Sequence, residues 1–206
     1  MKIYQKVIGD LQVNSYFLTQ DDKNAIVIDC GDNLSQLLNE SNRLGLKINA
    51  VLLTHAHFDH SGSAKALQEM GVKIYISDID APKLCNDDNL STHFGIKFNS
   101  LVPDHIFTNG QALEICGITL KVLLTPGHTN GSVCFVVDHY IFSGDTLFNC
   151  SVGRTDFPTG NLTELVNSIN YLFENYKNHI VFPGHGEKTT IELEKKFNPI
   201  FYYAKH

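Results

Sequence analysis

The chain has 206 residues, and its composition of 43% hydrophobic and 18% charged residues is that of an ordinary globular protein with room for a buried core. The net charge of −6 at pH 7 argues against nucleic acid as the main partner, because proteins that bind phosphate backbones usually carry a basic face. The five cysteines form no Cys-x-x-Cys pair, which disfavours a disulfide framework or a thiolate zinc site and favours reduced thiols in the cytoplasm.

The first part of the chain is predicted to alternate strands with helices. The first 30 residues are expected to form strands, including 14–19 and 25–29. Two further strands are expected at 49–55 and 73–77. Leucines at helical spacing predict a helix over 32–45 that ends at Gly45, and a shorter helix is expected over 62–70. The polar segment 80–105 is expected to be irregular.

The second part of the chain is richer in strands. The predicted strands are 112–116, 118–124, 133–137, 140–143 and 179–183, and Asp138-His139 is expected to form the turn of a hairpin. The clearest helix covers 161–176, where one wide apolar stripe is formed by Leu162, Leu165, Val166, Ile169, Leu172, Phe173 and Tyr176. A short helix is expected near the end. Strands mixed with helices in this order predict packed sheets covered by helices.

Histidines and aspartates gather directly after the predicted strands. They occur in VLLTHAHFDH, LLTPGHT, IFSGDT and IVFPGHG, and the residues concerned are His55, His57, Asp59, His60, His128, Asp145 and His185. Strand ends lie along the edges of sheets, so side chains far apart in sequence can meet there. Taken singly, His128, Asp145 or His185 could be an ordinary turn residue. The dense run HAHFDH is hard to explain as a solvated loop, and it favours a metal site.

The ligand chemistry points to more than one ion. Neutral imidazole nitrogens and carboxylate oxygens are the usual ligands of zinc and similar divalent ions. Seven such groups are too many for one tetrahedral ion, but they suit two ions about 3.5–4 Å apart with a water between them. We therefore expect two divalent cations, zinc first, with iron or manganese also compatible with the ligands.

The motif set resembles that of the metallo-β-lactamase-fold hydrolases, because HAHFDH is followed in order by TPGHT, SGDTLF and PGHG. The resemblance implies an α/β (α+β) fold, a four-layer αββα sandwich of two mixed β-sheets flanked by helices, with a dinuclear site at one edge. It also implies a ligand set. The first ion would be held by His55, His57 and His128, the second by Asp59, His60 and His185, and Asp145 would bridge them.

Within that superfamily the chain is most similar to short bacterial glyoxalase II-like (hydroxyacylglutathione hydrolase-like) proteins, through SGDTLF, GRTDFP and the ending KTTIELEKKFNP. Longer glyoxalase II enzymes carry a helical C-terminal domain that helps to hold glutathione. We expect a single domain over 1–206 without that helical domain, which leaves the identity of the thiol open. The family's early Asp-Pro-Gly reads Asp29-Cys30-Gly31 here.

The resemblance implies hydrolysis of a small-molecule acyl thiol by a metal-bridging hydroxide. Asp59 and Asp145 would also handle the proton during catalysis. Arg154 aligns with a basic residue that contacts the thiol in glyoxalase II relatives, and the alternative is a surface arginine paired with Asp156. Phe58, Phe148 and Phe157 could line the pocket, although core packing is the simpler expectation for each.

Three other functions remain open. Persulfide dioxygenases share the fold but use one iron held by two histidines and one aspartate. The commonest zinc β-lactamases place a cysteine where Asp145 stands. An inactive metal-binding scaffold would retain the ligands without the reaction. The N-terminus lacks the apolar core of a signal peptide, and no apolar run approaches the roughly 18 residues of a membrane span. We therefore expect a cytoplasmic protein without a membrane or nucleic-acid partner, and the oligomeric state is left open.

Overall fold

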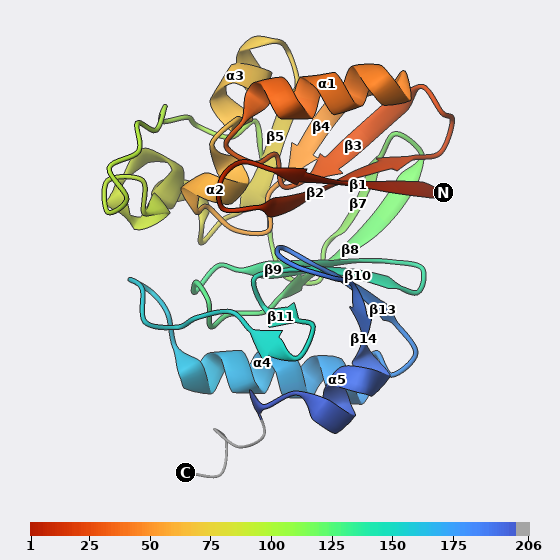
Figure 1. The fold of residues 1–206 in the computed structure, drawn as a ribbon, viewed down its shortest axis with the longest axis vertical. Coiled ribbons are helices and arrows are strands. Elements are labelled where there is room, and N and C mark those ends of the chain that lie inside the picture. Colours follow the sequence, from red (N-terminus) through yellow and green to blue (C-terminus); the bar gives the residue numbers. More distant parts are fainter. Residues whose placement is uncertain (201–206) are drawn as a thin grey trace.

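The chain folds into four layers in the computed structural model, which describes residues 1–200. Two sheets pack face to face, with α1 (Leu34–Leu44) and α3 (Ala64–Glu69) outside one sheet and α4 (Leu162–Asn175) and α5 (Ile191–Phe197) outside the other (Figure 1). This is the αββα sandwich that the motifs imply. The predicted domain of 1–206 includes residues 201–206, which lie outside the described residues.

The first sheet contains six strands in chain order: β1 (Lys2–Ile8), β2 (Val13–Thr19), β3 (Asn24–Ile28), β4 (Lys47–Leu52), β5 (Lys73–Ser77) and β6 (His105–Phe107). β1, β2 and β3 pair antiparallel, whereas β3 to β6 pair parallel. The parallel strands β3 and β4 are covered on both faces, which explains their nearly continuous apolar sequences.

The second sheet also has six strands, in the order β14 (Thr189–Thr190), β13 (Ile180–Pro183), β10 (Tyr140–Gly144), β9 (Val133–Val137), β8 (Ile118–Leu124) and β7 (Ala112–Ile115). β10 and β13 are parallel, and the other neighbours are antiparallel. β8, β10 and β13 therefore run in the same direction and end at the same edge. The predicted hairpin between β9 and β10 is confirmed, with Asp138 in the left-handed region at φ 51°.

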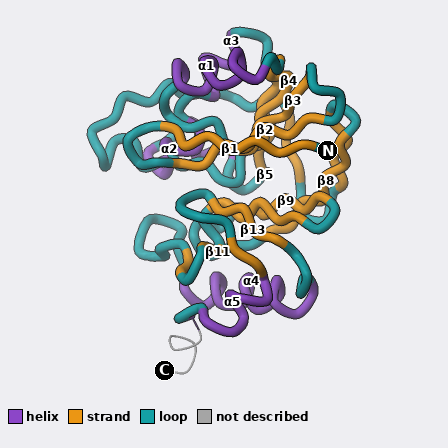
Figure 2. Tube along the Cα trace, turned by 45° about the vertical axis from the view of Figure 1, so that its right-hand side comes forward, coloured by secondary structure: helices purple, strands orange, loops and turns teal. Residues whose placement is uncertain are grey.

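Alternation along the strands divides the interior into three apolar layers. On β2, Phe17 faces the layer under α1 and α3, while Tyr16 and Leu18 face the other sheet. On β9, Phe135 points between the sheets and Cys134 packs in the layer under α4. Full burial of each large apolar side chain contributes about 1.5–3 kcal/mol. This burial holds the two sheets together. The turned view shows the strands of both sheets stacked between the helices (Figure 2).

Several local predictions differ from the structure. The helix expected over 62–70 is present as α3, which starts only at Ala64, and the short helix α2 (Phe58–Ser61), which begins immediately after His57, was not predicted. The segment 80–105, expected to be irregular, contains two 3-10 turns, η1 (Ala81–Cys85) and η2 (Asp87–Asn89).

Short strands and one end of a helix were also not anticipated. β6, β14 and the two-residue pair β11 (Leu147–Phe148) and β12 (Ser151–Val152) are too short to produce a periodic pattern. Leu162 belongs to the predicted stripe of α4, yet this first residue of the helix is 43% exposed. Of the helices in the described part of the chain, none has the length and apolar character needed to cross a membrane.

Candidate metal centre

Strand ends from both sheets bring the predicted site residues to one place. The loop after β4 carries His55 and His57, and α2 carries Asp59 and His60. The other three follow the C-terminal ends of β8, β10 and β13, and they are His128, Asp145 and His185. The structure therefore assembles all seven residues, from segments separated by up to 130 positions, into overlapping groups with donor atoms within 4.8 Å.

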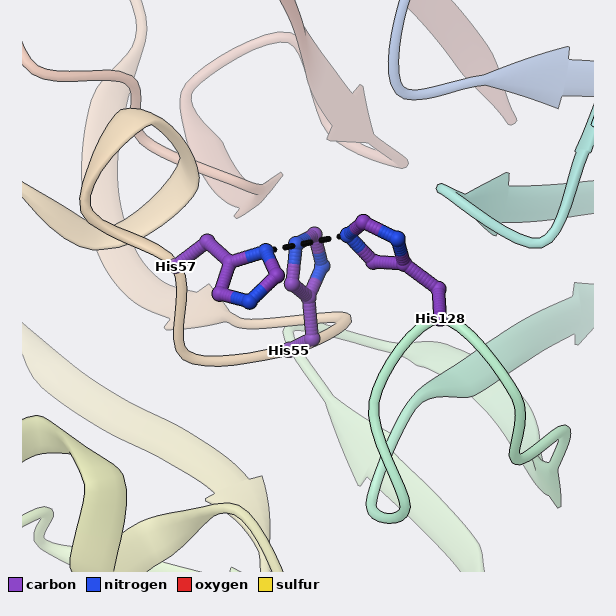
Figure 3. A group of neighbouring side chains, drawn as sticks. All are labelled: His55, His57 and His128. Atoms are coloured by element: carbon purple, nitrogen blue, oxygen red, sulfur yellow. Dashed lines mark hydrogen bonds between the residues drawn. The ribbon is translucent and has the colours of Figure 1, made fainter. Parts of the chain in front are cut away.

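The first group consists of the three histidines His55, His57 and His128. Nδ1 of His57 lies 2.9 Å from Nε2 of His128, and the His55 ring stands beside both (Figure 3). The ring centroids are 4.6 Å apart for His55 and His57 and 4.8 Å apart for His55 and His128. Three imidazoles that turn nitrogens toward a common point form the donor set of a zinc-type site.

The second group consists of Asp59, His60 and His185. Oδ2 of Asp59 lies 3.6 Å from Nε2 of His60 and 3.4 Å from Nε2 of His185. Asp145 stands between the two groups, since its Oδ1 is 3.3 Å from Nε2 of His60 and its Oδ2 is 3.5 Å from Nε2 of His128. A carboxylate in that position is within reach of a cation in either group.

Buried atoms of the cluster provide a test of whether cations fit there. Nε2 of His55, His57 and His60 and Oδ1 of Asp145 are buried without a hydrogen-bond partner among the described residues. Leaving such a group unsatisfied costs about 1–3 kcal/mol, and native proteins rarely tolerate several together. Cations in the cluster would satisfy Nε2 of His55 and His60 and Oδ1 of Asp145, which are nitrogen and oxygen donors suited to zinc, iron or manganese. Nε2 of His57 lies on the far side of a ring that turns Nδ1 toward His128. The cluster therefore fits divalent metal ions.

Neighbouring residues fix the orientation of two of the histidines. Nδ1 of His60 donates to Oδ2 of Asp29 at 2.8 Å, and the other carboxylate oxygen of Asp29 accepts from the backbone N–H of Thr54. Nδ1 of His128 donates to the backbone carbonyl of Arg154 at 2.8 Å. Both rings therefore present Nε2 to the cluster, which is the usual arrangement around ligating histidines.

The electrostatics of the cluster differ between its two groups. Burial and the neighbouring imidazoles lower the pKa of His55, and burial followed by His128 lowers that of His57 to about 3, so both rings are neutral at pH 7. Burial raises the pKa of the Asp145 carboxyl, but His60 and other histidines outweigh this and lower it. In the second group, burial opposes the charge of His60, but Asp145 and other carboxylates outweigh it and raise the pKa of His60 well above its usual range. A metal bound by this group would therefore displace a proton from His60, whereas His55 and His57 are already neutral.

Two glycines allow the close approach of these segments. A Cβ on Gly184 would lie 2.2 Å from Oδ1 of Asp145. Gly144 has φ 48°, and a Cβ there would lie 2.4 Å from Oγ1 of Thr54. These contacts explain why glycine precedes both Asp145 and His185 in the sequence.

The cluster opens into a cavity of about 410 Å³. Apart from five cluster residues, the lining consists of Leu11, Phe58, Leu90, Phe94, Phe148, Val152, Arg154 and Phe157. The three phenylalanines anticipated as core residues or pocket walls therefore all line the cavity. Among the described lining residues, Arg154 is the only lysine or arginine.

The Arg154 side chain makes both of the contacts considered from the sequence. Its guanidinium donates to Asp156 through two hydrogen bonds of 2.7 and 2.6 Å, and it lies 3.8 Å from the centre of the Phe157 ring. The pair with Asp156 lowers the pKa of that carboxyl to about 2. The guanidinium is therefore at the cavity wall and paired at the same time.

Sequence reasoning missed the residues that support the ligands. Asp29 was noted only as part of a turn, although its position directly after the buried run AIVI placed it at the same edge as the predicted ligands. Thr54, one residue before His55, carried no recognisable signal. Leu90 and Phe94 belong to the segment without periodicity, so nothing in their spacing indicated the cavity.

Comparison with known proteins agrees with this geometry. The family model described as the metallo-beta-lactamase superfamily matches residues 8–185. A probable metallo-hydrolase from Streptococcus pyogenes serotype M6 is 36% identical, with 98% of this chain and 91% of that protein covered. Hydroxyacylglutathione hydrolase GloC from Haemophilus influenzae is also 36% identical, with 91% and 92% covered.

Solved structures show the same architecture. The crystal structure of the BLEG-1 B3 metallo-β-lactamase superposes with a TM-score of 0.90 at 37% identity, covering 96% of this chain and 98% of that one. The crystal structure of TTHA1623 in a di-iron-bound form superposes with a TM-score of 0.85 at 34% identity, covering 95% and 98%. TTHA1623 is thus described with two irons. BLEG-1 is named for β-lactams, a different substrate class from the hydroxyacylglutathione in the name of GloC.

Proposed function

The chain belongs to the metallo-β-lactamase superfamily, and from this premise we propose that it is a two-metal hydrolase that cleaves acyl thioesters of glyoxalase II type. Membership of the superfamily and the histidine and aspartate cluster support a metal-dependent hydrolytic enzyme. The thioester substrate is a more specific proposal than metal-dependent hydrolysis. It is supported by the 36% identity to hydroxyacylglutathione hydrolase GloC over 91% of this chain.

One observation carries the proposal: the Asp145 carboxylate, which lines the cavity, lies 3.3 Å from Nε2 of His60 in one donor group and 3.5 Å from Nε2 of His128 in the other. Two divalent cations at these donors would lower the pKa of a coordinated water far below its ordinary value, toward about 7, and would polarise an acyl carbonyl. The other roles in the proposed reaction belong to side chains of the protein.

Each of these side chains has a separate task in the reaction. Asp145 holds the two donor groups together, and Asp29 keeps Nε2 of His60 directed at them. Asp59 lines the cavity and is partly exposed, so its carboxylate is placed to accept a proton from the attacking water. A departing thiol has an ordinary pKa of about 8.5 and leaves as the thiolate, so no strong general acid is required.

The cavity favours a substrate with an apolar portion. Phe58, Phe94 and Phe157 stand around it, with ring centroids 5.4 Å apart for Phe58 and Phe94 and 6.2 Å apart for Phe94 and Phe157. The Arg154 guanidinium also lines the cavity, where an anionic group of the thiol carrier would compete with its partner Asp156. We propose that the acyl group or the adjacent thiol arm packs on the phenylalanines and that Arg154 contacts the carrier.

A second candidate function is hydrolysis of a β-lactam, since the superposed BLEG-1 structure is named a B3 metallo-β-lactamase. Both reactions attack an acyl carbonyl, so the same cluster could serve either. Thioester cleavage is the better proposal because the curated relative GloC is named for a thioester substrate and the leaving thiolate needs no protonation. The one-iron dioxygenase alternative makes no use of the second group, Asp59, His60 and His185.

The test is a substrate panel applied to protein of measured metal content. The panel contains S-lactoylglutathione, a phenylacetyl thioester of a small thiol, a chromogenic β-lactam, and glutathione persulfide with oxygen uptake as the readout. We expect thiol release from at least one thioester, and its loss in Asp145→Asn. Cleavage of the β-lactam alone, or oxygen uptake without thioester cleavage, would overturn the proposal.

A further inference from the structure

A buried ion pair lies behind the three-histidine group and takes no part in the chemistry described above. Asp80, just before η1, and Lys83, within it, form a salt bridge, and their side chains are 0% and 5% exposed. Removing two charges from water costs several kcal/mol per ion, which is recovered only when each has well-placed partners. The partners of Asp80 therefore indicate what the pair does.

The Asp80 carboxylate contacts both loops that carry the three histidines. Its Oδ2 accepts from the backbone N–H of Ala56 at 3.0 Å, and Ala56 lies between His55 and His57. The hydroxyl of Thr129, which follows His128, lies 3.0 and 3.1 Å from the two carboxylate oxygens. A single carboxylate thus joins two segments that are about 70 residues apart in the chain and come from different sheets.

The carboxylate is itself held from several directions. The backbone N–H of Asp80 donates to the Ser77 hydroxyl at 3.1 Å, and that hydroxyl donates to the carbonyl of Gly131 at 2.7 Å. A Cβ on Gly131 would lie 2.3 Å from Oδ1 of Asp80. Lys83 also donates to the side-chain oxygen of Asn130. The pair is therefore anchored to β5 on one side and to the loop after His128 on the other.

We propose that Asp80 is a positioning residue for the cation of the three-histidine group, holding the His55–His57 loop and the His128 loop at the separation that the cation requires. Lys83 neutralises the buried charge of Asp80 and ties it to Asn130. The donor nitrogens of the group span only a few ångströms, so a small shift between the loops changes the geometry of the site. The inference rests on metal binding in the proposed function and is independent of the substrate.

The test compares Thr129→Val, Thr129→Ser and Asp80→Asn with the parent protein. Co²⁺ is bound in competition with a chelator, and its visible absorption reports the coordination geometry. Thr129→Val removes the hydroxyl that contacts Asp80, together with its contact to the Ser132 hydroxyl, without a large change in volume. Loss of outer contacts of this kind typically weakens metal affinity about 10- to 100-fold, so we expect Thr129→Val to bind one of its Co²⁺ equivalents that much more weakly and to show a changed spectrum. Thr129→Ser should restore both.

Thr189→Val is the matched control, because Thr189 is also a buried threonine whose hydroxyl donates to a buried carboxylate, that of Glu194, at 2.6 Å. We expect this variant to be destabilised to a similar extent while its Co²⁺ affinity and spectrum stay as in the parent. Equal Co²⁺ binding by Thr129→Val and Thr189→Val would overturn the inference, even if Asp80→Asn failed to fold. Absence of Co²⁺ binding by the parent would instead contradict the proposed function.

Discussion

Asp145 is the residue on which the two donor groups depend. Its two oxygens face His60 and His128 at 3.3 and 3.5 Å, and Oδ1 has no hydrogen-bond partner among residues 1–200. An amide in its place would keep the shape but lose the negative charge and one acceptor. The role of this residue can therefore be separated from its contribution to packing.

We expect Asp145→Asn to lose at least one of two bound cations and to reduce kcat for thioester cleavage by more than about 100-fold, since even outer contacts of a metal site typically cost 10- to 100-fold. Metal analysis after dialysis and steady-state kinetics provide the two measurements. Full activity with two cations retained would show that Asp145 is not a shared ligand.

Arg154 tests recognition of the substrate. If its guanidinium contacts an anionic thiol carrier, Arg154→Gln should raise KM for glutathione thioesters by roughly 10-fold, as expected for one charged hydrogen bond, with kcat nearly unchanged. Asp156→Asn is the informative partner, because it frees the guanidinium from its two hydrogen bonds and should lower KM or leave it the same. The role would be refuted by an unchanged KM in Arg154→Gln.

At the scale of elements, Asp104 connects a helix to the first sheet. Its carboxylate accepts from Lys73 at 2.8 Å, from Gln68 of α3 at 3.0 Å and from the backbone N–H of Ile74 at 3.1 Å. Burial opposes the charge, but these donors outweigh it and lower the pKa of Asp104 to about 2. A carboxyl with a lowered pKa stabilises the fold above its ordinary pKa, and this stabilisation is lost as the pH falls through the folded value.

Asp104→Asn should therefore lower the free energy of unfolding at pH 7 by about 1–2 kcal/mol, allowing for partial solvent screening of the pair. The difference from the parent should shrink between about pH 4 and pH 2, as the parent carboxyl takes up its proton. Urea unfolding at several pH values measures it. Asp22→Asn, which removes an exposed pair with Lys2, serves as the control and should change little. A pH-independent difference for Asp104→Asn would contradict this account.

Helix α4 shows how far a periodic pattern can be trusted. Leu165 is fully buried in the layer between α4 and the second sheet, whereas Leu162, one turn earlier, is 43% exposed. Leu165→Ala should cost about 2–5 kcal/mol of unfolding free energy, and Leu162→Ala should cost much less. Denaturant titrations measure both unfolding free energies. Equal losses for the two variants would mean that the buried face of α4 follows the apolar pattern of the sequence and not the packing in the structure.

At the scale of the whole molecule, the sequence predicted best what depends on local order. Apolar runs followed by His or Asp identified the ends of β4, β8, β10 and β13, and those ends converge as predicted. The supporting contacts could not be predicted in the same way. Asp29 with Thr54, and Asp80 with Thr129, meet only because particular strands pair, and no spacing within the sequence encodes that pairing.

Part of the cavity wall was also beyond prediction from the sequence. Leu90 and Phe94 lie in a polar segment without helical or strand periodicity, and they reach the cavity through the two 3-10 turns near Asp80. The composition of such a segment indicates neither its path nor its neighbours. Two residues of the cavity lining therefore come from the part of the chain where sequence patterns carry the least information.

The central claim, that seven side chains hold two cations, is tested most directly by an anomalous difference map from crystals of the metal-loaded protein. We expect two peaks about 3.5–4 Å apart, one among His55, His57 and His128 and the other among Asp59, His60 and His185, with Asp145 next to both. A single peak at full metal loading, or peaks outside the cluster, would contradict the account.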